Sequence, residues 1–401
     1  MNESVLTWGK ARRPKRMPVT GYSEPADDVL TELAADVFSP LRRRDQRLKA
    51  EQYLHGLLHA RGRKSMRNIA ATLAGPAAEQ GLQHFISNST WDWQLVRARL
   101  ARHLDRVSPP EAWVVQPLHI PKAGNQSAGV ETRYVPEYGQ VMSGQQAFGV
   151  WFADREGSTP VNWRLYLPPS WVGDPVRRSR TEIPEEVAEE HPEACAVAAV
   201  TGLRGWGLGT RPVLLDARLP ELRPVLGRLR AEHMPVLART TGSARFEVAD
   251  PAVPGYGAGP VAAQRIVEAV RGLRRPVAWT DPAGGWGTRT SLYVQVRVRF
   301  PQGGEAVLLG EWRDPHRPPV QLWVSTLADT PGEELVRLSK LSRRVARDTA
   351  EEGSRVGLRD FEGRSFPGWH RHMTLASVAL AAGTLGAARR HFGPLPARLT
   401  A

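Results

Sequence analysis

Hydrophobic and polar positions follow two different periods along the chain, and the change falls near residue 107. In residues 28–107 the apolar residues recur at helical spacing, as in EQYLHGLLHA and in the run that follows Asp92. This spacing predicts that the first part of the protein is entirely helical. Asp92 has the short acidic side chain typical of a helix N-cap, and Gly62 marks the end of a helix.

From residue 108 the apolar runs become short, and they are either unbroken or alternating, which predicts strands. The predicted strands are WVV, QQAFGVWFA, NWRLYLP, PVLL, PVLA, SLYVQVRVRF, EAVLLGEW and VQLWVST. An amphipathic stretch joins PVLL at 212–215 to PVLA at 235–238. A strand–helix–strand unit of this kind implies two parallel strands with a right-handed crossover. Residues 332–386 are again predicted to be helical.

These patterns predict a mixed α/β sheet that is preceded by helices and interrupted by a β-rich insertion. We expect six parts: a flexible basic N-terminus (1–27), a helical domain (28–107), the first part of an α/β core (108–240), a β-rich insertion (241–330), the helical end of the core (331–390) and a tail (391–401).

The sequence gives no reason to expect a membrane or secreted protein. Its longest apolar stretch, MTLASVALAAGTLG at 373–386, is shorter than the ~18 residues that a membrane span needs. We therefore expect a buried core helix there. The N-terminus is basic but lacks the apolar segment of a secretory signal. Cys195 is the only cysteine, so internal disulfides and a thiolate metal site are excluded and a cytoplasmic location is expected.

The net charge is +13, and arginine supplies most of the positive charge. Of the 54 basic residues six are lysine and 48 are arginine. A GC-rich genome explains arginine in place of lysine but not a surplus of positive charge. That surplus favours a polyanionic partner, because a guanidinium fits phosphate oxygens.

Two basic clusters within the helical part are candidates for phosphate contact. Up to residue 107 there are 18 Lys and Arg against 11 Asp and Glu. The candidate DNA-binding residues are Arg42, Arg43, Arg44 and Arg47 in one cluster and Arg61, Arg63, Lys64 and Arg67 in the other. The competing interpretation is that both clusters are solvated helix faces. Nucleic-acid binding would make this part a helical DNA-binding domain.

Four phrases resemble insertion-sequence transposases with a DDE endonuclease domain. They are GLLHARGRKSM, QHFISNSTWDW, RLYLPPSW and GLRDFEGRSFPGWHRHMTLA. The similarity runs in order from about residue 37 to about residue 390. It implies an N-terminal DNA-binding domain followed by an RNase H-like core with a β insertion. It also implies a catalytic site in which two Asp and one Glu hold two Mg²⁺ ions.

The positions that match these three acids are mostly not acidic in this chain. The paired Asp that ends the family's first strand matches Gln116 and Pro117, where we expect the strand to end. The second acid matches Asp216, and the third matches Ala346. Helix geometry turns Asp348 about 200° away from Ala346, so it cannot substitute. The resemblance therefore implies a degenerate member with no metal site.

The same resemblance adds Lys122, Arg364 and Arg371 to the candidate DNA-binding residues. His370 and His372 flank Arg371 and invite a metal interpretation. They lie outside the catalytic acids of the family, so a structural role is favoured.

Three functions remain open. The first is a transposase-derived protein that binds double-stranded DNA at the nucleoid without cutting it and needs no cofactor. The alternative is an active nuclease that uses Mg²⁺ and draws its acids from Asp154, Asp174 or Asp281. The third is a protein-interaction scaffold. The oligomeric state, the DNA site and the biological role stay open.

Overall fold

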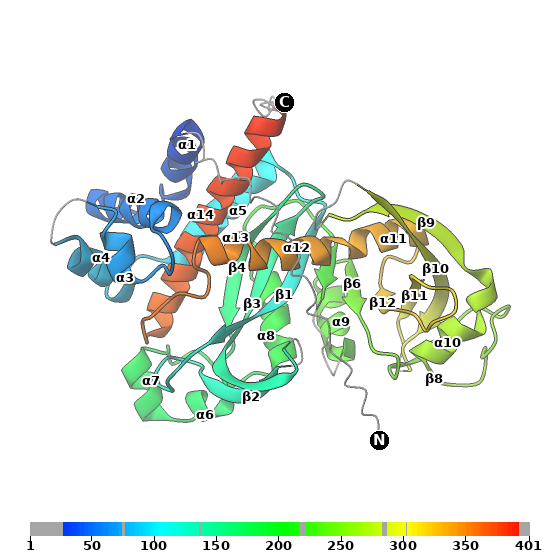
Figure 1. Ribbon diagram of the computed structural model, residues 1–401. Coiled ribbons are helices and arrows are strands. Elements are labelled where there is room, and N and C mark those ends of the chain that lie inside the picture. The colour runs from blue at the N-terminus through cyan, green and yellow to red at the C-terminus, as the bar shows by residue number, and fades with distance from the viewer. Residues whose placement is uncertain are drawn as a thin grey trace, which may run out of the picture.

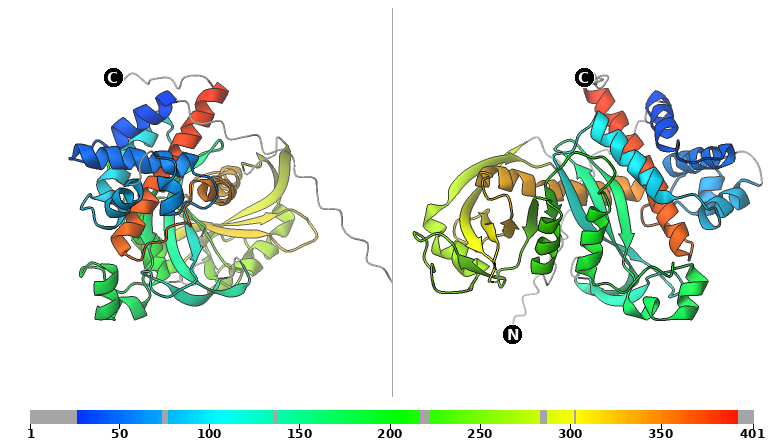
Figure 2. Two further views of the ribbon diagram at one scale, coloured as in Figure 1. Left: turned by 60° about the vertical axis from the view of Figure 1, so that its left-hand side comes forward. Right: turned by 180° about the vertical axis from the view of Figure 1, so that it is seen from behind.

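The computed structural model describes residues 27–73, 77–135, 138–216, 222–282, 287–301 and 303–392. Within them a 12-stranded mixed sheet forms the centre, and helices cover both of its faces (Figures 1 and 2). The predicted fold class, an RNase H-like mixed sheet preceded by helices, is confirmed. The predicted flexible segment 1–27, apart from Asp27, and the tail after Phe392 lie outside the described residues.

Five helices come first, as the helical spacing predicts. They are α1 (Asp27–Val37), α2 (Arg44–His59), α3 (Met66–Ala70), α4 (Ala78–Ser87) and α5 (Trp93–Val107). The Asp92 carboxylate accepts a hydrogen bond of 2.7 Å from the backbone N–H of Gln94, which confirms the predicted N-cap of α5. Helices α1, α2, α4 and α5 all pack on the long C-terminal helix α14 (Phe366–Phe392).

The first half of the sheet contains the strands that carry the candidate acid positions. They are β1 (Ala112–Pro121), β2 (Glu131–Val135), β3 (Gln140–Ala153), β4 (Ser158–Leu165), β5 (Val213–Leu215) and β6 (Val236–Arg239). β1 is antiparallel to β3 and parallel to β5, and β5 is parallel to β6. Helix α9 (Leu222–Ala231) connects β5 to β6, so the predicted strand–helix–strand unit is confirmed.

The expectation that β1 ends at Pro117 is wrong, because the strand continues to Pro121. Trp113 donates its backbone N–H toward β5, to Pro212 O at 3.0 Å, and donors alternate between the two edges of a strand. The nitrogen of Pro117 therefore faces the β5 side. β5 ends at Leu215, so the missing N–H of Pro117 costs no ladder bond there.

The second half of the sheet belongs to the predicted β-rich segment, yet it is continuous with the core. Its strands are β7 (Arg245–Val248), β8 (Val261–Ala262), β9 (Arg275–Thr280), β10 (Thr288–Arg299), β11 (Glu305–Trp312) and β12 (Gln321–Ser325). β12 pairs antiparallel with β6, with Trp323 opposite Arg239. Helix α10 (Ala263–Ala269) and the 3-10 turn η1 (Arg271–Leu273) complete this part.

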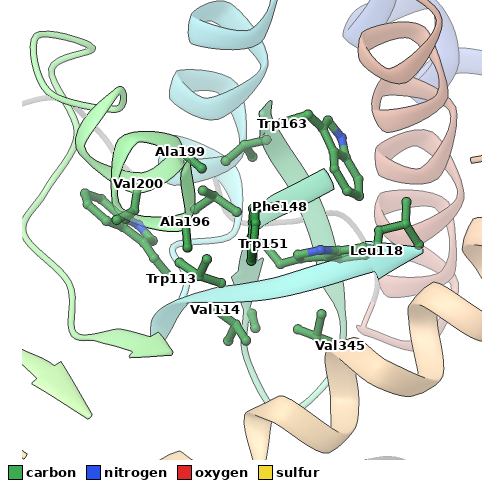
Figure 3. Close-up of a cluster of buried hydrophobic side chains, with 14 of the residues drawn as sticks. Trp113, Val114, Leu118, Phe148, Trp151, Trp163, Ala196, Ala199, Val200 and Val345 are labelled. Carbon is green, nitrogen blue, oxygen red and sulfur yellow. The ribbon is translucent and has the colours of Figure 1, made fainter. Parts of the chain in front are cut away.

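Different helices cover the two faces of β1. Figure 3 shows Trp113 against Ala196 and Val200 of α8 (Pro192–Thr201), and Val114 beside Val345 of α12 (Leu341–Ala350). Because side chains alternate along a strand, Gln116 faces α12, as Val114 does. The other helices of this region are α6 (Pro169–Val172), α7 (Pro175–Thr181), α11 (Gly332–Ser339) and α13 (Glu352–Arg355). Among the described residues, no helix is long and apolar enough to cross a membrane.

Candidate functional site

The sheet register places four side chains in one row across adjacent strands. Val115 lies opposite Leu215, and Leu215 lies opposite Ala238. One residue further, Gln116, Asp216 and Arg239 therefore follow one another across β1, β5 and β6. The backbone bond from Asp216 N–H to Val115 O at 3.2 Å extends the ladder to this level. Trp323, opposite Arg239 on β12, completes the row.

Helix α12 brings the third position to this row. The Gln116 side-chain amide donates a hydrogen bond of 2.8 Å to the backbone oxygen of Ser342. In a regular α-helix that oxygen is also the acceptor for the N–H of Ala346, four residues on. The structure therefore places Gln116 and Asp216 side by side and sets Gln116 against α12, one helical turn before Ala346. Ala346 itself is exposed.

The side chains at these positions do not fit a two-metal site. Mg²⁺ takes oxygen ligands and prefers carboxylates. Ala346 and Pro117 offer no side-chain ligand, and the Gln116 amide is oriented by its bond to the helix. Within the part of the chain that the structure describes, which excludes residues 217–221, no group of three or more His, Cys, Asp or Glu side chains could hold a metal ion.

The remaining acid, Asp216, forms an ion pair with a cation from the neighbouring strand. Arg239 Nε lies 3.1 Å from Asp216 Oδ1, and the two side chains are 23% and 13% exposed. The Arg239 guanidinium also lies over the Trp323 ring, 5.4 Å from its centroid. The ion pair is thus partly buried, and the Arg239 guanidinium lies between the Asp216 carboxylate and the Trp323 ring.

The three alternative acids have other structural roles. Asp154 accepts backbone N–H bonds from Glu156 and Gly157, both at 2.8 Å. Asp174 caps α7 through the N–H groups of residues 176 and 177. These contacts are those of turn and helix-cap carboxylates.

Asp281, the third alternative, is buried and lies among arginines. Its carboxylate is 2.7 Å from the Arg343 guanidinium and 3.4 Å from that of Arg289. The interaction ties the β9–β10 connection to α12, and it surrounds the carboxylate with positive charge. Such a pair stabilises an interface between elements and gives no support to a metal site.

Asp348, which was excluded as a substitute on helix geometry, lies on the buried side of α12. Asp348 is buried, 2.7 Å from the Ser158 hydroxyl and 2.9 Å from Arg344 Nε. Burial raises the pKa of Asp348, and Arg344 opposes that effect. With Glu351 and Glu352 it lines a cavity of about 560 Å³ near the start of β1, away from the carboxyl ends of β1 and β5. The predicted orientation of Asp348 is therefore confirmed.

Most of the candidate DNA-binding arginines of the helical part are exposed. Both clusters lie at the ends of α2, one around its first residue, Arg44, and one after its last residue, His59. We call the exposed set the α2–α3 rim: Arg42, Arg43, Arg44, Arg61, Arg63 and Arg67. Arg47 is half-buried and donates to Leu41 O at 2.7 Å, so it also supports the turn before α2.

Two of the candidate DNA-binding residues are buried, contrary to a role in surface contact. The Lys64 ammonium donates to Ala60 O at the end of α2, and its backbone N–H donates to Asp360 at 2.8 Å. The Arg371 guanidinium donates to Ile86 O and Ser87 O, the backbone oxygens of the last two residues of α4. Their positive groups face protein acceptors and are not available on the surface in this structure.

Lys122 and Arg364 are the remaining two candidate DNA-binding residues. Lys122 donates to Phe361 O, and burial, with Arg63 as a further cause, lowers the pKa of Lys122 to about 8. Arg364 is exposed, and its backbone oxygen accepts from Ala128. The neighbouring Glu362 lies 3.5 Å from Arg63 and forms an exposed ion pair with it.

The two histidines of GWHRH are core residues, which supports the structural interpretation. His372 is fully buried, with Nδ1 2.9 Å from the Tyr53 hydroxyl and Nε2 2.8 Å from Gly357 O. A carbonyl oxygen only accepts, so Nε2 carries the proton and Nδ1 accepts from Tyr53. Burial lowers the pKa of His372 to about 4. His370 is buried and stacks on Trp93.

Arg97 was not predicted as a structural residue from the sequence, and it is the most deeply buried charge of the junction between helices and sheet. Its guanidinium donates to Thr374 Oγ1, Asn162 Oδ1, Trp163 O and His370 O at 2.7–3.2 Å. Every one of these acceptors is uncharged. Burial lowers the pKa of Arg97 to about 9. No local pattern distinguishes this arginine from its exposed neighbours on α5.

Comparison with known protein families agrees with this arrangement. The family described as DDE superfamily endonuclease matches residues 36–303, about two thirds of the chain. The match includes the positions of Gln116 and Asp216, whereas Ala346 lies beyond it. A search of curated proteins finds no match. The match spans α2 to α5 and the strands β1 and β5, which hold the positions matched to the first two acids. The chain belongs to the DDE superfamily endonucleases.

Proposed function

We propose that this member of the DDE superfamily binds double-stranded DNA and does not cleave it. The observation that carries the proposal is the row at the ends of β1 and β5. Two of the positions matched to the family's acids lie there, Gln116 and Asp216, and the third, Ala346, lies on α12; the one acid is paired with Arg239. A single carboxylate cannot hold two metal ions, so the hydroxyl that attacks DNA would not be activated.

The DNA-binding half of the proposal is supported by charge and by exposure. The chain has a net charge of +13, and the six arginines of the α2–α3 rim are exposed. Arginines on a surface neutralise phosphates and release counterions, which gives affinity without cleavage. Such a protein would act as a repressor, as an inhibitor of transposition or as a DNA-architectural factor.

Salt dependence of binding to a labelled duplex tests the first half. The association constant should fall steeply with salt, by about 0.9 logarithmic units per logarithmic unit of salt for each phosphate neutralised. A neutral protein of similar size serves as the control. Binding at low salt that is no tighter than the control's would contradict DNA binding.

Nicking of supercoiled plasmid in Mg²⁺ or Mn²⁺ tests the second half, with Asp216→Ala assayed beside the wild type. We expect no nicking above background from either protein. Metal-dependent nicking that disappears in Asp216→Ala would show a working metal site and would favour the active-nuclease alternative.

A further inference from the structure

The cation beside Asp216 is part of the sheet and not a loosely placed surface residue. Arg239 is the last residue of β6, and the parallel pairing of β5 with β6 sets it next to Asp216. Neighbouring residues of adjacent strands point to the same face of a sheet. The ion pair of 3.1 Å is therefore a consequence of strand register.

The guanidinium is also constrained on its other side. Trp323 is fully buried, lies opposite Arg239 on β12, and places its ring 5.4 Å from the guanidinium. A planar guanidinium stacks favourably on an aromatic ring, and the contact limits the rotamers that the side chain can adopt. Trp323 thus holds the charge of Arg239 toward Asp216.

We propose that Arg239 is the resident cation of this site and stands in place of a divalent metal as the counter-ion of Asp216. The inference rests on the proposed function and deepens it. Missing acids explain why the metal would bind weakly. Arg239 adds a second barrier, so restoring the acids alone does not restore the metal site.

Two physical effects disfavour the replacement of Arg239 by a divalent metal ion beside Asp216. A guanidinium stays protonated and has no lone pair to offer a metal, so it contributes repulsion and no ligand. It also places its positive charge 3.1 Å from Asp216 Oδ1, one of the two oxygens with which the carboxylate would bind Mg²⁺, without donating a hydrogen bond to that oxygen. A divalent ion would have to displace an ion pair that strand register and Trp323 both maintain.

Mn²⁺ binding to three acid-restored variants of the full chain tests the proposal. The first carries Gln116→Asp and Ala346→Glu, the second adds Arg239→Ala, and the third instead adds Arg239→Lys. Binding is measured by the electron paramagnetic resonance signal of free Mn²⁺ and by calorimetry. We expect the Arg239→Ala variant to bind at least tenfold more tightly than the other two, because lysine keeps the charge and alanine removes it.

Equal Mn²⁺ affinity with and without Arg239 would overturn the proposal, and so would no Mn²⁺ binding in any variant. Circular dichroism checks that each variant is folded. If the acid-restored variants do not fold, Asp216→Asn and Arg239→Gln are made in the wild type, singly and together. The ion pair predicts that the double variant melts no lower than the less stable single variant, and strictly additive losses would contradict it.

Failure of this inference and failure of the proposed function give different results. The inference is decided by acid-restored variants and by the Asp216–Arg239 pair. The proposed function is decided by the wild type alone, through DNA binding and plasmid nicking. A wild type that binds but does not nick, together with tight Mn²⁺ binding beside an intact Arg239, would refute the inference and leave the proposed function standing.

Discussion

At the junction of α5, β4 and α14 the Arg97 guanidinium is fully buried among uncharged acceptors, whereas along the α2–α3 rim six arginine side chains are exposed. The junction uses the positive charge of α5 to bind backbone and side-chain oxygens of β4 and α14. The rim arginines stay exposed, with Arg43 and Arg63 in exposed ion pairs, so they can meet a polyanion. The net charge of +13 therefore contains arginines with two roles, some that stabilise the fold and some that can bind a ligand. Variants at the two regions should change stability and DNA binding separately.

The largest expected effect is at the junction. Arg97→Met removes the donor for Asn162 Oδ1, Trp163 O and His370 O and leaves these acceptors buried. The free energy of unfolding should fall by on the order of 4 kcal/mol, because each of these buried acceptors loses a charge-assisted bond and only His370 O keeps the bond from the Thr374 hydroxyl. Chemical denaturation measures this loss.

Arg102→Ala is the matched control, because Arg102 lies on the same helix and is exposed. It should change the free energy of unfolding by less than about 0.5 kcal/mol. Similar losses in both variants would remove the distinction between the junction and exposed arginines.

The second effect appears as pH dependence of the junction's stability. The pKa of His372 is about 4 in the folded protein and near 6.5 when unfolded. Between these values the unfolded chain takes up a proton that the folded protein excludes. The free energy of unfolding should therefore fall by about 3 kcal/mol from this group as the pH falls from 6.5 to 4.

His372→Gln isolates this contribution, since a glutamine amide can donate to Gly357 O and accept from Tyr53 without titrating. Thermal or denaturant unfolding at several pH values compares the two proteins. Identical pH profiles would mean that His372 does not exclude a proton in the folded state.

Much of the fold follows from local patterns, and the reasons for the exceptions are physical. The unit β5–α9–β6 was predicted because apolar periods mark short local elements. Helix α8 was missed because it is buried on most sides and PEACAVAAVT has no polar face. The pairing of β12 with β6 joins residues more than 80 positions apart. A sequence gives no local signal for such a contact, so the β-rich segment was expected as a separate insertion.

Some features of the candidate site were predicted from the sequence and others were not. The three acid positions were matched from the sequence, and the structure places Gln116 beside Asp216 and joins Gln116 to Ser342 of α12, one turn before Ala346. The pairing of Asp216 with Arg239 was not predicted, because it depends on the register between two strands. Lys64 and Arg371 were grouped with exposed arginines, since burial of a basic side chain depends on which elements later cover it.

The third effect belongs to the rim and should leave stability unchanged. In a variant with Arg61, Arg63 and Arg67 all changed to alanine, duplex binding should weaken in proportion on every sequence. The slope of log K against log salt should decrease by about one for each arginine that contacts phosphate. Fluorescence titration at several salt concentrations measures the slope, and denaturation confirms the fold. An unchanged slope would place the DNA contacts elsewhere.

The smallest effect is a change in duplex affinity that depends on Lys122. Lys122 is less buried than Arg97 and more buried than the rim arginines. Its ammonium donates to Phe361 O, and burial lowers the pKa of Lys122 to about 8. If the side chain contacts phosphate, it contributes positive charge below pH 8 and little above. Duplex affinity should then fall a few-fold between pH 7 and pH 9, consistent with the loss of about one charge from the salt slope. Lys122→Arg keeps its charge over this range and should bind almost independently of pH. The same fall in the Lys122→Arg variant would assign the titration to another group and place Lys122 with the buried cations of the fold.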